Sequence, residues 1–113
     1  MVRIYFVNQV VTSIQDINPK DYSYIAVAEI EVDTPNQAWN IVQNIDTSWV
    51  EEYSDTVHLT AKGEVMAHHK SEGRGLRSMM VGDIVEVVDS GEYYLCDFIG
   101  WRKLEKNEVP WLK

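Results

Sequence analysis

The chain has 113 residues, of which 45% are hydrophobic and 25% charged, and this fits one globular domain over residues 1–113. Ten lysines and arginines against eighteen aspartates and glutamates give a formal net charge of −8, and this negative field disfavours generic nucleic-acid binding. No run of about 18 apolar residues is present, so we expect no membrane-spanning helix, and the single Cys96 favours a cytoplasmic protein without an internal disulfide.

The first third of the chain predicts two strands. Residues 2–12 are rich in β-branched and aromatic residues, and residues 22–32 form a long alternating run after a turn at Asn18-Pro19. Regular alternation in the second strand would place five of its side chains on one face: Tyr22, Tyr24, Ala26, Ala28 and Ile30.

The segment DTPNQAWNIVQNI predicts a helix over about residues 35–45. Thr34 suits the N-cap, Pro35 the first helical position, and Gln37 the third residue of a capping box. Apolar residues follow at helical spacing, so one face should pack on the sheet. After it, the segment WVEEY is typical of a further short helical turn.

The second half predicts hairpins. Alternation over TVHLTAKGEVMA indicates two strands joined by a turn at Lys62-Gly63, and residues 70–78 read as a polar loop. Residues 83–105 then predict three further strands, with an Asp-Ser-Gly turn between the first two. We therefore expect an α+β domain with one mostly antiparallel sheet of about five to six strands and one main helix. The sheet can be strongly curled, and its late hairpins can form a small barrel.

No motif points to catalysis, so we expect neither enzyme activity nor a cofactor. Cys96 lies inside an apolar run, where cysteine usually serves packing. His68 and His69 would point to opposite faces of a strand, and no metal-ligand spacing such as CxxC or HExxH is present. The sequence therefore predicts no metal site.

The segment GRGLRSMMVGD raises the question of what its two arginines contact. Arg77 can pair with Asp83 or Asp97 inside the fold, whereas Arg74, between two glycines, is the better candidate for an external contact. In an alternative interpretation, Arg74 and Arg77 join two later cations in a basic patch that binds a nucleotide or RNA on a small barrel. Those two cations are Arg102 and Lys103.

Trp111 is a further candidate for binding. We expect it to dock on its own domain together with Val109 and Leu112, with contact to a second copy as the alternative. Together with a free strand edge, such a contact would support a homodimer.

Two later segments, RSMMVGDIVEV and EYYLCDFIGWRKL, combine an Arg-Ser pair, a Gly-Asp pair before an apolar strand, and a tyrosine-rich strand that closes on a Gly-aromatic pair. Mainly over residues 76–104, this pattern resembles the YodL-like domains, small modules found in phage, plasmid and other mobile-element proteins. The helix expected at 35–45 is similar to the helix upstream in that family. The resemblance implies an accessory module without known catalysis. It assigns the motif positions to Arg77, Ser78, Gly82, Asp83, Tyr94, Asp97, Gly100 and Trp101.

The net charge has two interpretations, solubility or an acidic face patterned to meet a basic partner. Combined with the resemblance, the second predicts a small cytoplasmic accessory protein, encoded by a phage or mobile element, that acts by binding another protein. A basic, nucleic-acid-binding host protein is the partner that the charge favours.

Overall fold

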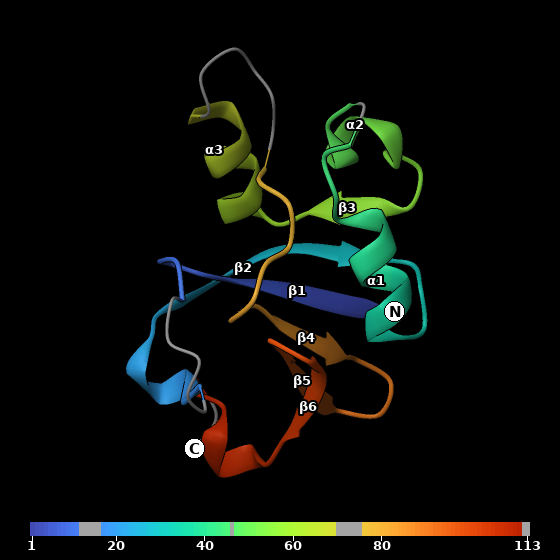
Figure 1. Ribbon diagram of the computed structural model, residues 1–113. Helices are drawn as coiled ribbons and strands as arrows, with labels where there is room; N and C mark the ends of the chain where they lie inside the picture. Colours follow the sequence, from blue (N-terminus) through green and yellow to red (C-terminus); the bar gives the residue numbers. More distant parts are fainter. Residues whose placement is uncertain (12–16, 46, 70–75, 112–113) are drawn as a thin grey trace.

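The computed structural model describes residues 1–11, 17–45, 47–69 and 76–111 (Figure 1). Its centre is one antiparallel sheet of six strands in the order β3-β2-β1-β4-β5-β6. The strands are β1 (Val2–Val7), β2 (Tyr24–Ile30), β3 (Val57–Leu59), β4 (Ile84–Val87), β5 (Glu92–Asp97) and β6 (Gly100–Leu104). The helices are α1 (Pro35–Ile41), α2 (Trp49–Glu52) and α3 (Ala61–His69), with short 3-10 turns η1 (Pro19–Asp21) and η3 (Lys106–Glu108).

The expected fold class is confirmed. The first strand, β1, lies in the middle of the sheet and pairs with β2 on one side and β4 on the other. Strands β4, β5 and β6 then form the predicted meander. Among the described residues β3 and β6 each pair on one side only, so the sheet is open and does not close into a barrel.

The predicted alternation along β2 is broken by a bulge. Ile4 pairs with Ala28 but Tyr5 pairs with Ala26, so Val27 is an extra residue on β2. Tyr24 and Ala26 therefore pack on one face of the sheet, whereas Val27, Ala28 and Ile30 pack on the other. The single face expected for residues 22–30 is wrong, because a bulge changes which side each later residue faces.

The predicted hairpin turn at Lys62-Gly63 is also wrong, because residues 61–69 form helix α3. The Thr60 side chain caps this helix by accepting a hydrogen bond from the Gly63 backbone N–H at 2.9 Å. Thr60 also anchors it to the bulge, donating its backbone N–H to the Val27 carbonyl at 3.0 Å. A side chain at Gly63 would lie 2.0 Å from that carbonyl oxygen, so glycine serves the close approach of α3 to β2.

Helix α1 begins where predicted and ends earlier. Val42 is its C-cap and is fully buried, while Ile45 is exposed to solvent. The chain leaves the helix there because Val42 O accepts from the Met79 N–H at 2.8 Å, and Asn44 N donates to the Ser78 hydroxyl oxygen at 2.7 Å. The expectation of one main helix is also wrong, because α3 has nine residues and α1 has seven.

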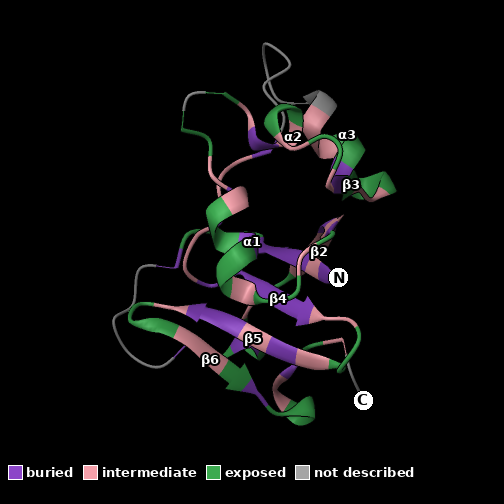
Figure 2. Cartoon of the chain, turned by 90° about the vertical axis from the view of Figure 1, so that its right-hand side faces the viewer, coloured by how far each residue is buried: buried purple, intermediate pink, exposed green. Residues whose placement is uncertain are grey.

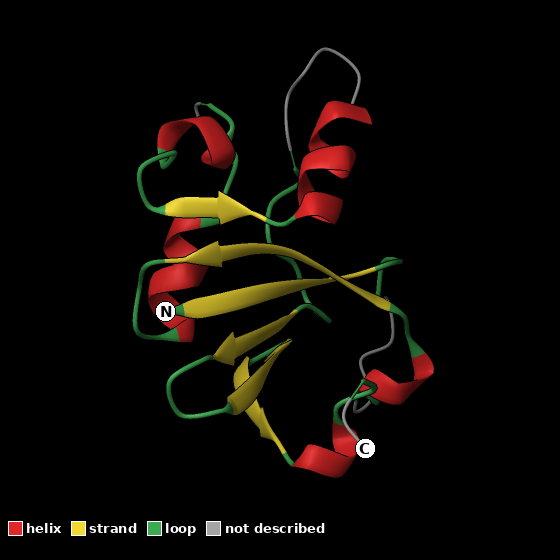
Figure 3. Ribbon diagram, turned by 180° about the vertical axis from the view of Figure 1, so that it is seen from behind, coloured by secondary structure: helices red, strands yellow, loops and turns green. Residues whose placement is uncertain are grey.

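Two apolar cores lie on the two faces of the sheet. One contains the fully buried Trp49 with Phe6 and residues of α1, and the segment 76–79 covers it. The other contains Leu95 and Leu104 and is covered by residues near η1 and by the segment that follows η3. Figure 2 shows β1, β4 and β5 largely buried and much of α1 and β6 exposed. In Figure 3, α2 and α3 lie beyond β3, whereas η3 follows β6 at the opposite edge.

Within the described ranges, the structure contains no helix that is both long and apolar enough to cross a membrane.

Candidate functional site

A surface hollow lies between α1 and the turn that joins β5 to β6. Its volume is about 300 Å³, and its walls include Trp39 of α1, Val81 before β4, and Phe98 and Trp101 around the turn. Ligand pockets usually span about 300–1,000 Å³. The hollow is at the small end of that range, which suits one or two inserted side chains.

Helix α1 is held against β6 by its first turn. The Thr34 hydroxyl accepts a hydrogen bond from the Gln37 N–H at 3.3 Å, and the Gln37 side chain accepts from the Thr34 N–H at 3.1 Å, which completes a capping box. Asn36 in this turn accepts from the Trp101 indole N–H at 2.8 Å. The hydrogen bond fixes the position of the indole ring and sets the width of the hollow.

The rim of the hollow exposes large apolar side chains. Trp39 is 37% exposed, Phe98 is 44% exposed, and Ile99 at the tip of the hairpin is 99% exposed. A hairpin tip usually carries small polar residues, and contiguous exposed apolar groups mark contact sites. Tryptophan and phenylalanine are also enriched in the centres of protein interfaces.

Two polar residues complete the hollow. Cys96 is buried, and burial together with the nearby charges of Asp83 and Asp97 raises the pKa of its thiol to about 12, so it is no nucleophile at neutral pH. Asp97 accepts from the Phe98 N–H at 2.7 Å, and its other carboxylate oxygen lies 3.7 Å from Arg102 Nε. That oxygen retains capacity for a donor from outside.

The net charge of the molecule is carried by residues 21–61, of which the uncharged helix α1 lines the hollow. Residues 21–61 contain eight aspartates and glutamates and no lysine or arginine, whereas the rest of the chain contains ten of each sign. We call residues 21–61 the acidic segment; it comprises β2, α1, α2 and β3. Its exposed carboxylates include Glu31, Asp33, Glu51, Glu52 and Asp55. This absence of basic residues is visible in the sequence alone.

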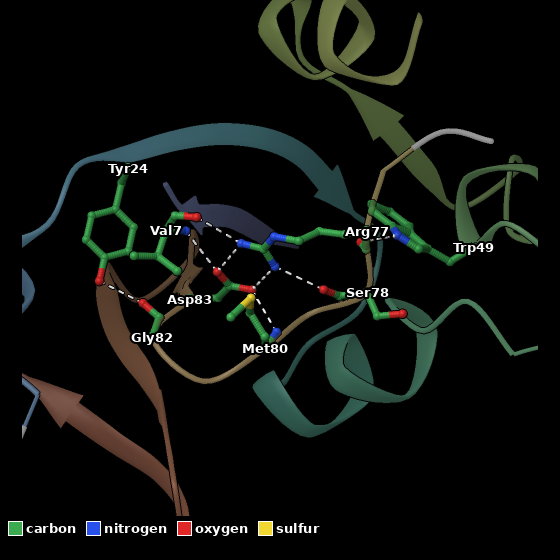
Figure 4. A network of polar contacts seen from close by, with 8 residues as sticks. All are labelled: Val7, Tyr24, Trp49, Arg77, Ser78, Met80, Gly82 and Asp83. Atoms are coloured by element: carbon green, nitrogen blue, oxygen red, sulfur yellow. Dashed lines mark hydrogen bonds and ion pairs between the residues drawn. The ribbon is translucent and has the colours of Figure 1, made fainter. Parts of the chain in front are cut away.

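Arg77 belongs to a closed internal network, as predicted (Figure 4). Its guanidinium donates to both oxygens of Asp83 at 2.8 Å, and to the carbonyls of Val7 at 3.0 Å and Ser78 at 2.9 Å. It also lies 3.9 Å above the Phe6 ring. All of these contacts are internal, so the arginine braces the loop before β4.

Asp83 receives further support from the backbone. The N–H groups of Val7 and Met80 each donate to it at 2.8 Å. Burial raises the pKa of this fully buried carboxyl, while the hydrogen bonds from Arg77 act in the opposite direction. The Trp49 indole donates to the Arg77 carbonyl at 2.8 Å, and the Tyr24 hydroxyl donates to the Gly82 carbonyl at 2.7 Å, so the network is tied to both cores.

The structure does not join the predicted basic residues into one patch. Lys103 lies 2.6 Å from Glu92, and Arg102 lies 3.4 Å from Glu108. As neighbours on strand β6, Arg102 and Lys103 point to opposite faces of the sheet. Arg77 has its own partner, and Arg74 lies outside the described residues.

Trp111 docks on its own domain. Its ring stacks on Tyr5 at 4.1 Å between centroids and contacts Tyr24 and Tyr93 edge-on. Beneath it the Tyr5 hydroxyl donates to Glu86 at 2.8 Å, and burial raises the pKa of Tyr5 to about 12. Val109 is fully buried in the same core, and Leu112 lies outside the described residues.

The remaining residues that the sequence singled out have structural contacts. The Ser78 hydroxyl accepts a hydrogen bond from the Asn44 N–H, and the Tyr94 hydroxyl donates to Glu92 at 3.4 Å. Gly82 and Gly100 have positive φ angles of 100° and 130°. His68 and His69 lie in α3, so the strand argument applied to them is wrong. Over the described part of the chain, no group of three histidine, cysteine or acidic side chains is arranged to hold a metal ion.

Comparison of the chain with models of known families, with curated proteins and with solved structures finds no match. The resemblance to YodL-like domains therefore stays a prediction from the motif residues.

Proposed function

We propose that this protein acts by binding another protein, with the hollow between α1 and β6 as the centre of its contact surface. The observation that carries the proposal is the exposed aromatic rim of the hollow, one wall of which is α1, a helix of the segment 21–61 that holds the whole net charge. Aromatic anchors provide affinity, and a charged surround provides steering and selectivity.

The proposed partner is a basic protein. With eight carboxylates and no lysine or arginine, the acidic segment attracts positive charge and repels nucleic acid. A nucleic-acid-binding protein of the cell is one class with the required charge. From the resemblance to YodL-like domains we keep the proposal that the protein is a cytoplasmic accessory factor of a phage or other mobile element, which the neighbouring genes test directly.

The alternative of a nucleotide or RNA site has weaker support. Arg77, Arg102 and Lys103 each have an acidic partner inside the fold, so they offer no shared cationic surface. A ligand phosphate would have to displace these carboxylates before it could bind.

Capture of partners by matched variants tests the proposal. The immobilised protein is exposed to lysate of its source cells at low salt, and bound proteins are identified by mass spectrometry. We expect wild type to retain a basic protein that elutes as salt rises, because salt screens surface charges. Trp39→Ala should lose it, and the pair Glu31→Gln with Asp33→Asn, in the exposed segment that leads into α1, should weaken its retention.

A control pair has the same change in charge at a different place. Glu64 and Asp89 are exposed and lie outside the acidic segment. Glu64→Gln with Asp89→Asn should therefore retain the partner. Equal retention by wild type and by all the variants would refute the assignment of this surface.

A further inference from the structure

We propose that the partner binds as an extended strand along the open edge of β6 and inserts one apolar side chain into the hollow. This inference rests on the proposed function and specifies how the partner is held. Its occupant is a lysine- or arginine-rich extended segment of another protein. Peptide segments that add to a sheet edge gain affinity from main-chain hydrogen bonds and specificity from side-chain pockets.

Strand β6 presents an edge suited to pairing. Its five residues pair with β5 alone among the described residues and contain no proline. Edge strands are usually shortened, bulged or covered to prevent such pairing. The other edge, β3, has three residues and leads directly into α3, which leaves a much shorter template.

The turn defines which backbone groups of β6 are free. Phe98 and Ile99 form a two-residue turn that closes on the Asp97–Gly100 pair. The two residues of such a closing pair are hydrogen-bonded to each other, and the ladder alternates from there. Trp101 and Lys103 therefore direct their backbone N–H and C=O groups toward the open edge.

The hollow lies beside these free groups. The Trp101 side chain forms one of its walls while the Trp101 backbone faces the edge. A strand paired there would place alternate side chains on the α1 side of the sheet, next to Trp39 and Trp101. One apolar side chain of the partner can thus enter the hollow while its backbone pairs with β6.

Charge identifies the occupant as a basic segment and disfavours a second copy. The cations of β6 are already neutralised, Arg102 by Asp97 and Glu108 and Lys103 by Glu92. At the hollow, Asp97 retains capacity for an outside donor, and the unbalanced negative charge of the molecule lies in residues 21–61. A second copy would bring a further −8, and symmetric antiparallel pairing of β6 would set Arg102 opposite its own copy.

The test uses a short synthetic peptide that alternates lysine with valine and has phenylalanine at its centre. Isotope-labelled protein is titrated with it, and amide shifts and hydrogen exchange are followed by NMR. We expect shifts at β6 and around the hollow, with slower exchange of the Trp101 and Lys103 amides. A peptide methylated at the backbone nitrogens of alternate residues keeps its side chains and should bind roughly tenfold more weakly or worse.

Two substitutions at one position separate backbone from side chain. Lys103→Pro removes an outward N–H, whereas Lys103→Ala removes the side chain and keeps the N–H. We expect Lys103→Pro to bind the peptide roughly tenfold more weakly, and Lys103→Ala to bind it at least as well as wild type, because one cation has left the surface. The methylated peptide provides the same test without altering the protein, should the proline impair folding.

The outcomes distinguish this inference from the function on which it rests. Equal binding of the methylated and unmodified peptides, or shifts at the hollow that leave the β6 amides unprotected, would overturn strand addition and leave the contact surface intact. Strand addition would also be overturned, with the contact surface left intact, if Trp39→Ala loses lysate capture while the wild-type protein binds no peptide. A dimer in gel filtration that Lys103→Pro abolishes would show that a second copy, and not a basic partner, occupies the edge.

Discussion

Two aspartates at neighbouring ends of strands β4 and β5 have opposite environments. Asp83 precedes β4 and Asp97 ends β5, and the sheet brings them close, since Cys96 N–H donates to the Asp83 carbonyl at 2.9 Å. The Asp83 side chain is fully buried and accepts from Arg77 and two backbone N–H groups. The Asp97 side chain is 20% exposed and has one short hydrogen bond, from Phe98.

The difference shows what allows a carboxylate to be buried in this fold. Ionised groups leave water only where donors replace it. The loop of residues 77–83, which folds back over Phe6, supplies these donors together with the Val7 N–H of β1. The turn after Asp97 supplies few, and its apolar residues Phe98 and Ile99 stay exposed. One region is therefore closed and stabilises the fold, while the other is open and available for contact.

Asp83→Asn should have the largest effect on stability. The amide cannot accept from all four donors, and Arg77 loses its partner while three-quarters buried. Breaking such a pair costs about 3–5 kcal/mol, a large share of the roughly 5–15 kcal/mol that stabilises a domain. Urea denaturation measures the change. Asp89→Asn, at an exposed site, is the control and should change stability little; similar values for both variants would mean that the network does not stabilise the fold.

The glycines beside the two aspartates give the next largest difference. Gly82 and Gly100 both have positive φ, and an L-residue there costs about 1–2 kcal/mol. A Cβ at Gly82 would also lie 2.6 Å from a methyl group of Val11, whereas at Gly100 it meets open space. Gly82→Ala should therefore lower the free energy of unfolding by about 3 kcal/mol and Gly100→Ala by about 1–2 kcal/mol. Equal losses would show that the loop before β4 is no more closely packed than the turn after β5.

The features that were predicted correctly depend on residues that lie close together in the sequence. The cap at Thr34, the meander of residues 84–104 and the Arg77–Asp83 pair all follow from residues within about ten positions of one another. The bulge at Val27 could not be predicted, because it depends on its pairing with β1 and on the approach of Thr60. Helix α3 was missed because its residues alternate as a strand does. Its cap, from Thr60 to Gly63, is local, but the contact of Thr60 with Ala26 of β2 is tertiary.

The candidate site was harder to predict than the fold. The hollow requires Asn36 and Trp101 to meet, and these are 65 positions apart. Nothing local shows that Phe98 and Ile99, which precede the last predicted strand, stay exposed. The acidic segment can be identified without a structure, since the absence of lysine and arginine from residues 21–61 is plain in the sequence.

Cys96 lies between the two aspartates and reports on both. Burial raises its pKa from 9.0 to about 12, so the unfolded chain loses the thiol proton first. The stability linked to this thiol is therefore present below pH 9.0 and lost as pH rises toward 12. A thiol reagent should react at least about a hundredfold more slowly with native protein than with urea-unfolded protein, since reaction waits for opening. Asp83→Asn should accelerate it; comparable rates for native and unfolded wild type would place Cys96 at the surface.

Asp97→Asn should have the smallest effect on stability and a clear effect on binding. The amide oxygen can still accept from the Phe98 N–H, and the lost ion pair with Arg102 is a loose contact of 3.7 Å, so unfolding should change by less than about 1 kcal/mol. Removing a carboxylate from the hollow should still weaken binding of the lysine-valine peptide several-fold, most clearly at low salt. Calorimetric titration beside urea denaturation gives both quantities for the same sample. If stability falls as far as in Asp83→Asn while peptide affinity is unchanged, Asp97 stabilises the fold just as Asp83 does, and the turn after β5 is no contact surface.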